Sequence, residues 1–365
     1  MVTADLFNCS SVRVNDIDGA PWEGIRQHLI SNGESTTLFP GVTIFMNVLE
    51  KTPTENSIAL RRGDFQNLAE ALDYAAEGET GINFYSGKGD LAVALPYGLL
   101  RSMARSLARK LLGLGLPRGG RMALVAETDA DFVRFFFACQ YAGLVPVPLP
   151  AVVHLGGRQA FVDNLRKLVH SSGAQAAMSS CSFLPFLTEA VSGLKLKHVG
   201  EPGLFNALPE TDLPLQIPRP EDVAYLQYTS GSTRFPRGVV ITQKTVMANL
   251  SGIIRHGLSV RPGDRCTSWL PFYHDMWLVG FLIAPMASQL STDYLSTRDF
   301  AMRPRLLPSA LRPSTKDSLS IELTAKRLLK TERLSRCKGM TSAGRLRNSS
   351  SVLLPFPGTR LKSTN

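Results

Sequence analysis

Strand-like and helix-like hydrophobic patterns alternate along most of this 365-residue chain, and this alternation restricts the possible folds more than any other feature. Short apolar runs predict buried strands, whereas apolar residues spaced three or four apart predict amphipathic helices. We expect strands at 122–126, 144–149, 174–178, 198–199, 223–228 and 266–270, and helices at 99–114, 128–142, 161–169 and 243–256. Strands that alternate with helices predict an α/β fold, with a mostly parallel sheet flanked by helices.

The net charge of +10 comes from the C-terminal part of the chain. Residues 303–365 hold 14 Lys and Arg against 3 Asp and Glu, and the remaining residues hold 26 against 27. A nearly neutral body argues against a nucleic-acid-binding domain, although a basic tail could still contact anions. The same segment has one aromatic residue, Phe356, and 16 Ser or Thr, so it has little to bury and is expected to be disordered.

The cysteines and the apolar segments indicate a cytoplasmic protein. The five cysteines are Cys9, Cys139, Cys181, Cys266 and Cys337. They form no C-x-x-C pair, and an odd, scattered set favours reduced thiols in a cytoplasmic compartment. The most apolar run, 132–153, is interrupted by Arg134, Gln140 and three prolines, so we expect no membrane span. The first 18 residues lack the pattern of a secretion signal.

A loop rich in glycine and hydroxyl residues follows the predicted strand at 223–228. Glycines let backbone N–H groups approach an anion, the hydroxyls add donors, and Arg237 adds a positive charge. The loop therefore predicts a phosphate site, beyond the carboxyl end of its strand. It has neither the Gly-Lys-Ser/Thr of a Walker loop nor a dinucleotide fingerprint. The alternative is an ordinary Gly/Ser turn between a strand and a helix.

His274 and Asp275 form a second candidate site. A histidine beside an acid, directly after an aromatic-rich strand end, suits the wall of a binding site. The alternative is a surface pair that caps a helix, with Asp275 as the N-cap.

The loop Tyr228-Thr229-Ser230-Gly231-Ser232-Thr233-x-x-Pro236-x-Gly238 resembles the phosphate-loop signature of adenylate-forming enzymes, the AMP-dependent synthetase and ligase superfamily. Within that superfamily the chain most resembles the fatty acyl-AMP ligases, over roughly residues 64–305. Further features carry this resemblance: Leu226-Gln227, Arg234 where most relatives have glycine, the run Trp269-Leu270-Pro271-Phe272-Tyr273-His274-Asp275-Met276, and the segments 77–85 and 135–150.

The resemblance implies part of the large N-terminal domain of such an enzyme, together with specific roles for the loop. The residues expected to hold the ATP phosphates are Thr229, Ser230, Gly231, Ser232, Thr233, Arg237 and Gly238. By the same resemblance His274 stabilises negative charge while the substrate carboxylate attacks the α-phosphate. The implied cofactors are ATP and Mg²⁺, without an identified metal ligand. The implied substrate is a fatty acid, and the implied acceptor is an acyl carrier protein or polyketide synthase. An acyl-CoA synthetase is the alternative within the superfamily.

The residues after His274 depart from the family pattern or allow two interpretations. Trp277 stands where these ligases carry glycine, so its ring is expected to narrow the acyl pocket or displace the following helix. An apolar helix face follows, made of Leu278, Phe281, Leu282, Ile283 and Met286. This face could line an acyl tunnel, but we expect it to belong to the core.

We predict three regions: an unassigned N-terminal extension at 1–62, a partial AMP-dependent synthetase/ligase domain at 63–305, and a basic Ser/Thr-rich tail at 306–365. The later family motifs have no match here, and a frameshift or premature ending would account for the tail. These include the adenine-contacting aromatic, the acid near Mg²⁺, the ribose-binding aspartate and the catalytic lysine. We therefore expect a weakly active or inactive form of the ligase. The alternative from another class is a non-catalytic remnant that binds a nucleotide or a partner.

Overall fold

The computed structural model describes residues 36–39, 42–44, 58–151, 157–229, 236–257, 260 and 264–303. The chain divides into two compact units, Met1–Leu323 and Thr324–Asn365, and every described residue lies in the first. The predicted disorder of residues 306–365 therefore lies outside the described part. Strands β1 (Thr36–Phe39) and β2 (Val42–Ile44) form a short antiparallel pair.

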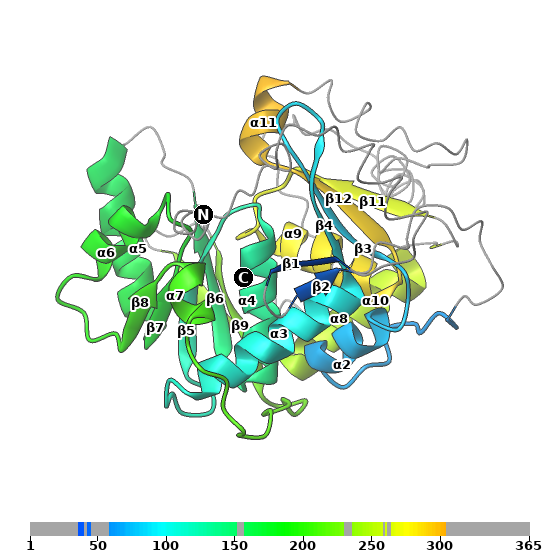
Figure 1. The fold of residues 1–365 in the computed structure, drawn as a ribbon, viewed down its shortest axis with the longest axis horizontal. Helices are drawn as coiled ribbons and strands as arrows, with labels where there is room; N and C mark the ends of the chain where they lie inside the picture. Colours follow the sequence, from blue (N-terminus) through cyan, green and yellow to red (C-terminus); the bar gives the residue numbers. More distant parts are fainter. Residues whose placement is uncertain are drawn as a thin grey trace, which may run out of the picture. The chain divides into compact units, whose positions relative to one another are not determined.

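A four-stranded, fully parallel sheet forms one part of the fold (Figure 1). Its order is β6 (Val145–Pro150), β5 (Arg121–Ala126), β7 (Ala176–Met178) and β8 (His198–Gly200). Alternate residues of β5 belong to two different hydrophobic clusters, with Met122 and Leu124 in one and Ala123 and Val125 in the other. Both faces of the sheet are thus covered, which explains why its strands are continuous apolar runs.

A second four-stranded sheet is parallel except for one hairpin. Its order is β11 (Arg265–Ser268), β12 (Ser291–Leu295), β3 (Gly81–Tyr85) and β4 (Leu91–Pro96), with β3 and β4 antiparallel. Polar side chains link neighbouring strands of this sheet. Both carboxylate oxygens of the buried Asp293 on β12 accept from Arg265 on β11, at 2.7 and 3.1 Å. Asn83 on β3 also donates to Asp293, at 2.8 Å.

The helices of the described residues pack around these sheets (Figure 1). They are α2 (Leu68–Ala75), α3 (Tyr97–Leu112), α4 (Ala130–Tyr141), α5 (Gly157–Ser172), α6 (Leu184–Val191), α7 (Pro202–Asn206), α8 (Gln243–Gly252), α9 (Asp275–Trp277), α10 (Ala284–Ala287) and α11 (Thr297–Met302). Two π-helices, η2 (Ile253–Gly257) and η3 (Leu278–Ile283), continue α8 and α9. None of the described helices is long and apolar enough to cross a membrane.

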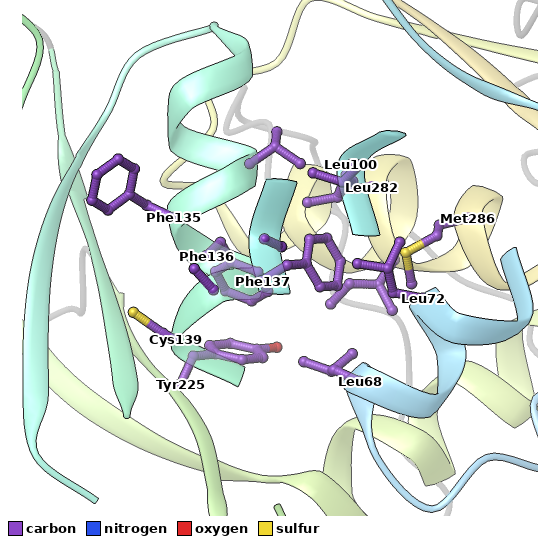
Figure 2. Packing of buried hydrophobic residues seen from close by; sticks show 14 of the residues in the cluster. Leu68, Leu72, Leu100, Phe135, Phe136, Phe137, Cys139, Tyr225, Leu282 and Met286 are labelled. Carbon is purple, nitrogen blue, oxygen red and sulfur yellow. The ribbon is translucent and has the colours of Figure 1, made fainter. Parts of the chain in front are cut away.

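Helix α4 is buried from Phe132 to Tyr141 without an exposed stripe, as expected for a helix surrounded by protein. Figure 2 shows Phe137 on the side of α4 that faces Leu72, with Phe135 on the opposite side. The Phe132 ring also lies 5.8 Å from that of Phe272, which follows β11. Because α4 packs on the parallel sheet and also meets residues next to the second sheet, it joins the two halves of the core.

Buried amide side chains add a polar connection to this core. Gln140 on α4 donates to the carbonyl oxygen of Ala224 at 2.8 Å and accepts from Gln243 at 2.7 Å. Gln243 in turn accepts the backbone N–H of Leu68 at 2.9 Å. Each amide nitrogen and oxygen in this chain of contacts has a partner, so these buried polar groups fix the relative placement of β9, α4, α8 and α2.

The sequence predicted most of these elements, with some differences. Helices at 99–114, 128–142 and 161–169 are confirmed as α3, α4 and α5. The helix expected at 243–256 changes to a π-helix after Gly252. The strand expected at 266–270 ends earlier, as Arg265–Ser268. The hairpin β3–β4, the strand β12 and the helix α2 were not predicted.

Asp129 is the N-cap of α4. Its carboxylate accepts the N–H of Phe132 at 2.8 Å. The residue as a whole is part-exposed, but burial of the carboxyl raises the pKa of Asp129 from 3.8 to about 7. The Phe132 amide and Arg134 oppose this shift, whereas the negative charges of Asp131 and Glu127 add to it.

The sign of this shift predicts how stability depends on pH. The unfolded chain releases the Asp129 proton near pH 4, whereas the folded chain holds it up to about pH 7. The stability that protonated Asp129 contributes is therefore complete below pH 4 and is lost as the pH rises to 7. We expect Asp129→Asn, which keeps an N-cap acceptor, to flatten the decline in unfolding free energy between pH 5 and 7.5, measured with urea. The exposed Asp212→Asn should keep the wild-type slope, and an unchanged slope in Asp129→Asn would contradict the assignment.

Candidate functional site

The glycine-rich loop connects two antiparallel strands, β9 (Val223–Thr229) and β10 (Arg237–Thr242). Arg237 lies opposite Thr229, and Gly238 lies opposite Tyr228, so three of the predicted site residues meet at the base of the loop. The other four, Ser230, Gly231, Ser232 and Thr233, lie outside the described residues. The sequence led us to expect a helix after the loop; α8 begins at Gln243 as predicted, but β10 comes first.

Tyr228 anchors the hairpin to α5. Its hydroxyl donates to the carbonyl oxygen of Leu168 at 3.1 Å and lies 2.6 Å from the Ser171 hydroxyl. A Cβ atom at Gly238 would come within 3.3 Å of the Tyr228 ring, so glycine lets β10 lie close to that ring. The Arg237 side chain is exposed and can meet an anion from solvent.

Strand β10 is open to solvent on both faces. Val239 and Val240 point to opposite sides of a strand, yet 42% and 53% of their surfaces are exposed. β9 is the only strand among the described residues that pairs with β10. The second edge of β10 therefore presents unpaired backbone groups next to apolar side chains.

His274 occupies the N-cap position of α9, directly after the turn in which its N–H donates to the Pro271 carbonyl oxygen at 3.0 Å. The Nδ1 atom of His274 lies 2.7 Å from Oδ1 of Asp275. The same oxygen accepts the N–H of Met276 at 2.7 Å, while Nδ1 lies 3.2 Å from that amide. The pair thus caps the helix, as the alternative interpretation predicted, but the N-cap residue is His274 and not Asp275.

Capping does not prevent His274 from meeting a ligand. Its side chain is 54% exposed and that of Asp275 is 62% exposed. Because Nδ1 faces Asp275, Nε2 is the ring nitrogen left for an external partner. The His274 ring is thus open to solvent, with the Asp275 carboxylate beside its Nδ1 atom.

Gln227 connects the two candidate segments. Its Nε2 donates to the carbonyl oxygen of Tyr273 at 2.8 Å, across 46 residues of sequence. Tyr273 directly precedes His274, and Gln227 lies two residues before Thr229. The base of the loop and the His274 turn are therefore neighbours in space, although the roles assigned to their residues stay predictions. Leu226-Gln227 was noted in the sequence only as a family feature, and no sequence signal indicated this contact.

A cavity of about 390 Å³ lies elsewhere. It opens beside the amino ends of β5, β6 and β9, where Arg121, Val145 and Val223 line it. Neither Thr229 nor His274 borders it. Within the described ranges, no group of three or more His, Cys, Asp and Glu residues could hold a metal ion.

Trp277 is fully buried in an aromatic cluster. Its ring stacks on Phe272 with centroids 3.4 Å apart and meets Phe132 and Tyr294 at 6.0 and 5.4 Å. The π-helix η3 follows it immediately. Leu278, Leu282, Ile283 and Met286 are fully buried and Phe281 packs against them, which confirms the core interpretation of this face (Figure 2 shows Leu282 and Met286).

Comparison with known proteins identifies the family. A family described as AMP-binding enzyme matches residues 81–311, which is well over half of the chain. The chain belongs to this AMP-binding enzyme family. A Caulobacter vibrioides protein, provisionally named an acyl-CoA synthetase, is 47% identical over 70% of this chain and 44% of its own length. The long-chain-fatty-acid–AMP ligase FadD32 of Mycolicibacterium smegmatis is 31% identical over 61% of this chain and 35% of its own length.

A solved structure from studies of fatty acyl-adenylate ligases from E. coli and L. pneumophila is 49% identical, with a TM-score of 0.67. It is covered over 47% of its length by 72% of this chain. This chain thus spans less than half the length of these relatives. The predicted fold, part of the large N-terminal domain of an adenylate-forming enzyme, is confirmed, as is the similarity to fatty acyl-AMP ligases.

Substitutions at Trp277 test its place in the core of this chain. We expect Trp277→Ala to lower the free energy of unfolding by about 3–5 kcal/mol, because it leaves a large cavity between aromatic rings. Trp277→Phe should cost only about 1 kcal/mol, since the indole N–H has no hydrogen-bond partner among the described residues. Urea unfolding measures both. Equal tolerance of the two changes would show that the ring does not fill the core.

Proposed function

We propose that this chain carries the ATP-phosphate-binding half of a fatty acyl-AMP ligase. The observation that most supports the proposal is the Gln227–Tyr273 hydrogen bond, because it brings the base of the phosphate loop next to His274. The similarity to fatty acyl-adenylate ligases supplies the reaction class. In that reaction a carboxylate oxygen of the fatty acid bonds to the α-phosphorus of ATP. The bond between the α-phosphorus and the oxygen that bridges it to the β-phosphate breaks, which yields acyl-AMP and pyrophosphate.

The proposed roles follow from the side chains at hand. Thr229, Ser230, Gly231, Ser232, Thr233 and Gly238 hold phosphate oxygens through hydroxyls and backbone amides. Arg237 pairs with a phosphate through its guanidinium fork. His274, with Asp275 as counter-ion, donates from Nε2 to the oxygens on which negative charge builds up during the attack.

The finer assignments are also proposals. Residues 63–305 form the partial ligase domain, with an extension before it and a basic tail after it. By family resemblance the acceptor is an acyl carrier protein or polyketide synthase, whereas the name of the Caulobacter relative supports coenzyme A. Transfer assays with each acceptor distinguish the two. A cytoplasmic location is supported by the buried thiols of Cys139 and Cys266.

The open edge and the exposed valines of β10 favour a second candidate, a partner-binding protein without catalysis. If the wild-type chain does not bind ATP, this partner-binding candidate is favoured.

ATP binding tests the phosphate site directly. Isothermal titration should show that Arg237→Ala weakens ATP binding by about 10-fold or more, because a charge-assisted hydrogen bond contributes about 1.5–3 kcal/mol. Arg237→Lys should recover part of the loss, and the exposed Lys195→Ala should bind as wild type. Ser230→Ala/Ser232→Ala should also bind weakly. Equal affinity in Arg237→Ala and the wild type would contradict the phosphate role.

Pyrophosphate release tests catalysis. We expect release with medium- and long-chain fatty acids to stay at the level of a His274→Ala control, because this chain spans less than half the length of its relatives. Release well above that control would show that the chain is an active ligase.

A further inference from the structure

Gln227 is an unusual residue for its position in the fold. It lies in β9 after Ala224, Tyr225 and Leu226, and only 5% of its surface is exposed. Its Nε2 donates to Tyr273 at 2.8 Å and to the carbonyl oxygen of Tyr228 at 3.3 Å. Its Oε1 is buried and has no hydrogen-bond partner among the described residues. Among the described residues, the amide nitrogen therefore has hydrogen-bond partners and the amide oxygen has none.

The orientation of the amide follows from its neighbours. Both atoms next to Nε2 are carbonyl oxygens, which can only accept, so the nitrogen must face them and Oε1 must turn away. An apolar side chain of the same length would leave the carbonyl oxygens of Tyr228 and Tyr273 without this donor, so glutamine suits the position through the two hydrogen bonds of Nε2.

The same face of β9 also feels the charge of the His274 segment. Tyr225 is two residues before Gln227 and so points to the same side of the strand. Burial raises the pKa of the Tyr225 hydroxyl, and the negative charge of Asp275 raises it further. Asp275 is the residue that pairs with His274. Gln227 thus contacts the residue before His274, and Tyr225 on the same face feels the charge of the residue after it.

We propose that Gln227 is a positioning residue that fixes the separation between the base of the phosphate loop and His274. Its hydrogen bond joins the residue before His274 to the strand whose last residue is Thr229. The purpose of this residue rests on the proposed function. The Gln227–Tyr273 hydrogen bond itself, which we call the clamp, is a property of the ligand-free protein. Loss of the hydrogen bond would let the His274 turn move away from β9 while the core stays intact.

Hydrogen exchange of the full chain, followed by mass spectrometry, tests the clamp without any ligand. In Gln227→Met, which keeps the length but donates no hydrogen bond, exchange of amides at 270–277 should rise at least about fivefold. The α4 segment Ala130–Tyr141 should keep its wild-type protection, and Tm should stay within about 3 °C. Gln159→Met, on the exposed surface of α5, is the matched control and should behave as wild type.

Gln227→Glu adds a readout that a purely structural role would not move. A protonated carboxyl can donate to the Tyr273 oxygen, whereas an ionised one repels it, and burial favours the protonated form. Protection of 270–277, relative to wild type at the same pH, should be near normal at pH 5 and lost at pH 8. In Gln227→Met it should be lost at both.

Two results would overturn the proposal. One is wild-type protection of 270–277 in Gln227→Met at both pH values. The other is a loss of protection that spreads to α4 with a large fall in Tm, since Gln227 would then support the core as a whole. A parallel arm with ATP keeps the two proposals separate. If ATP leaves exchange of the wild type unchanged while Gln227→Met still loosens 270–277, the clamp stands and the nucleotide function fails.

Discussion

The burial of α4 between the two parts of the core is the constraint on which the rest of the structure depends. A helix with Phe at 132, 135, 136 and 137 has no face that water can accept, so protein must surround it. The parallel sheet covers one side, and α2, α3 and the segment after β11 cover the others. Gln140 then joins this helix to β9 through a hydrogen bond. The strand that leads into the phosphate loop is thereby fixed to the centre of the core.

The candidate site sits at the edge of this rigid body. Thr229 and Arg237 are the ends of two paired strands, and His274 begins a short helix that Trp277 anchors in the core. Arg237 and His274 are exposed and Thr229 is half-buried, and Thr229 and His274 each lie two residues from a buried side chain, Gln227 and Phe272. Such an arrangement lets backbone and side chains meet a charged ligand without disturbing the hydrophobic core.

Much of the fold could be predicted because burial leaves a readable pattern. Strand β5 is covered on both faces, so every residue from Met122 to Ala126 is apolar, and α3 keeps a regular apolar face from Leu100 to Leu111. Strand β3 buries only Ile82 and Phe84, which is too short a pattern to recognise. β10 could not be predicted from burial, since its apolar residues are exposed. The hydrogen bond between Gln227 and Tyr273 depends on the tertiary fold, which local residue patterns do not specify. The loop motif and His274-Asp275 could be read from the sequence, because their chemistry is local.

The uncovered strand β10 has a consequence for how this chain behaves in concentrated solution. Among the described strands its second edge has no partner, and with its two outward valines it offers a template onto which another extended segment can add. In natural sheets, lysine, proline or a bulge usually protects an edge strand from pairing with other chains. In β10, Pro236 and Arg237 at its start are the residues of this kind. Molecules crowded together would therefore tend to stack through this strand, and a covering polypeptide would keep them apart.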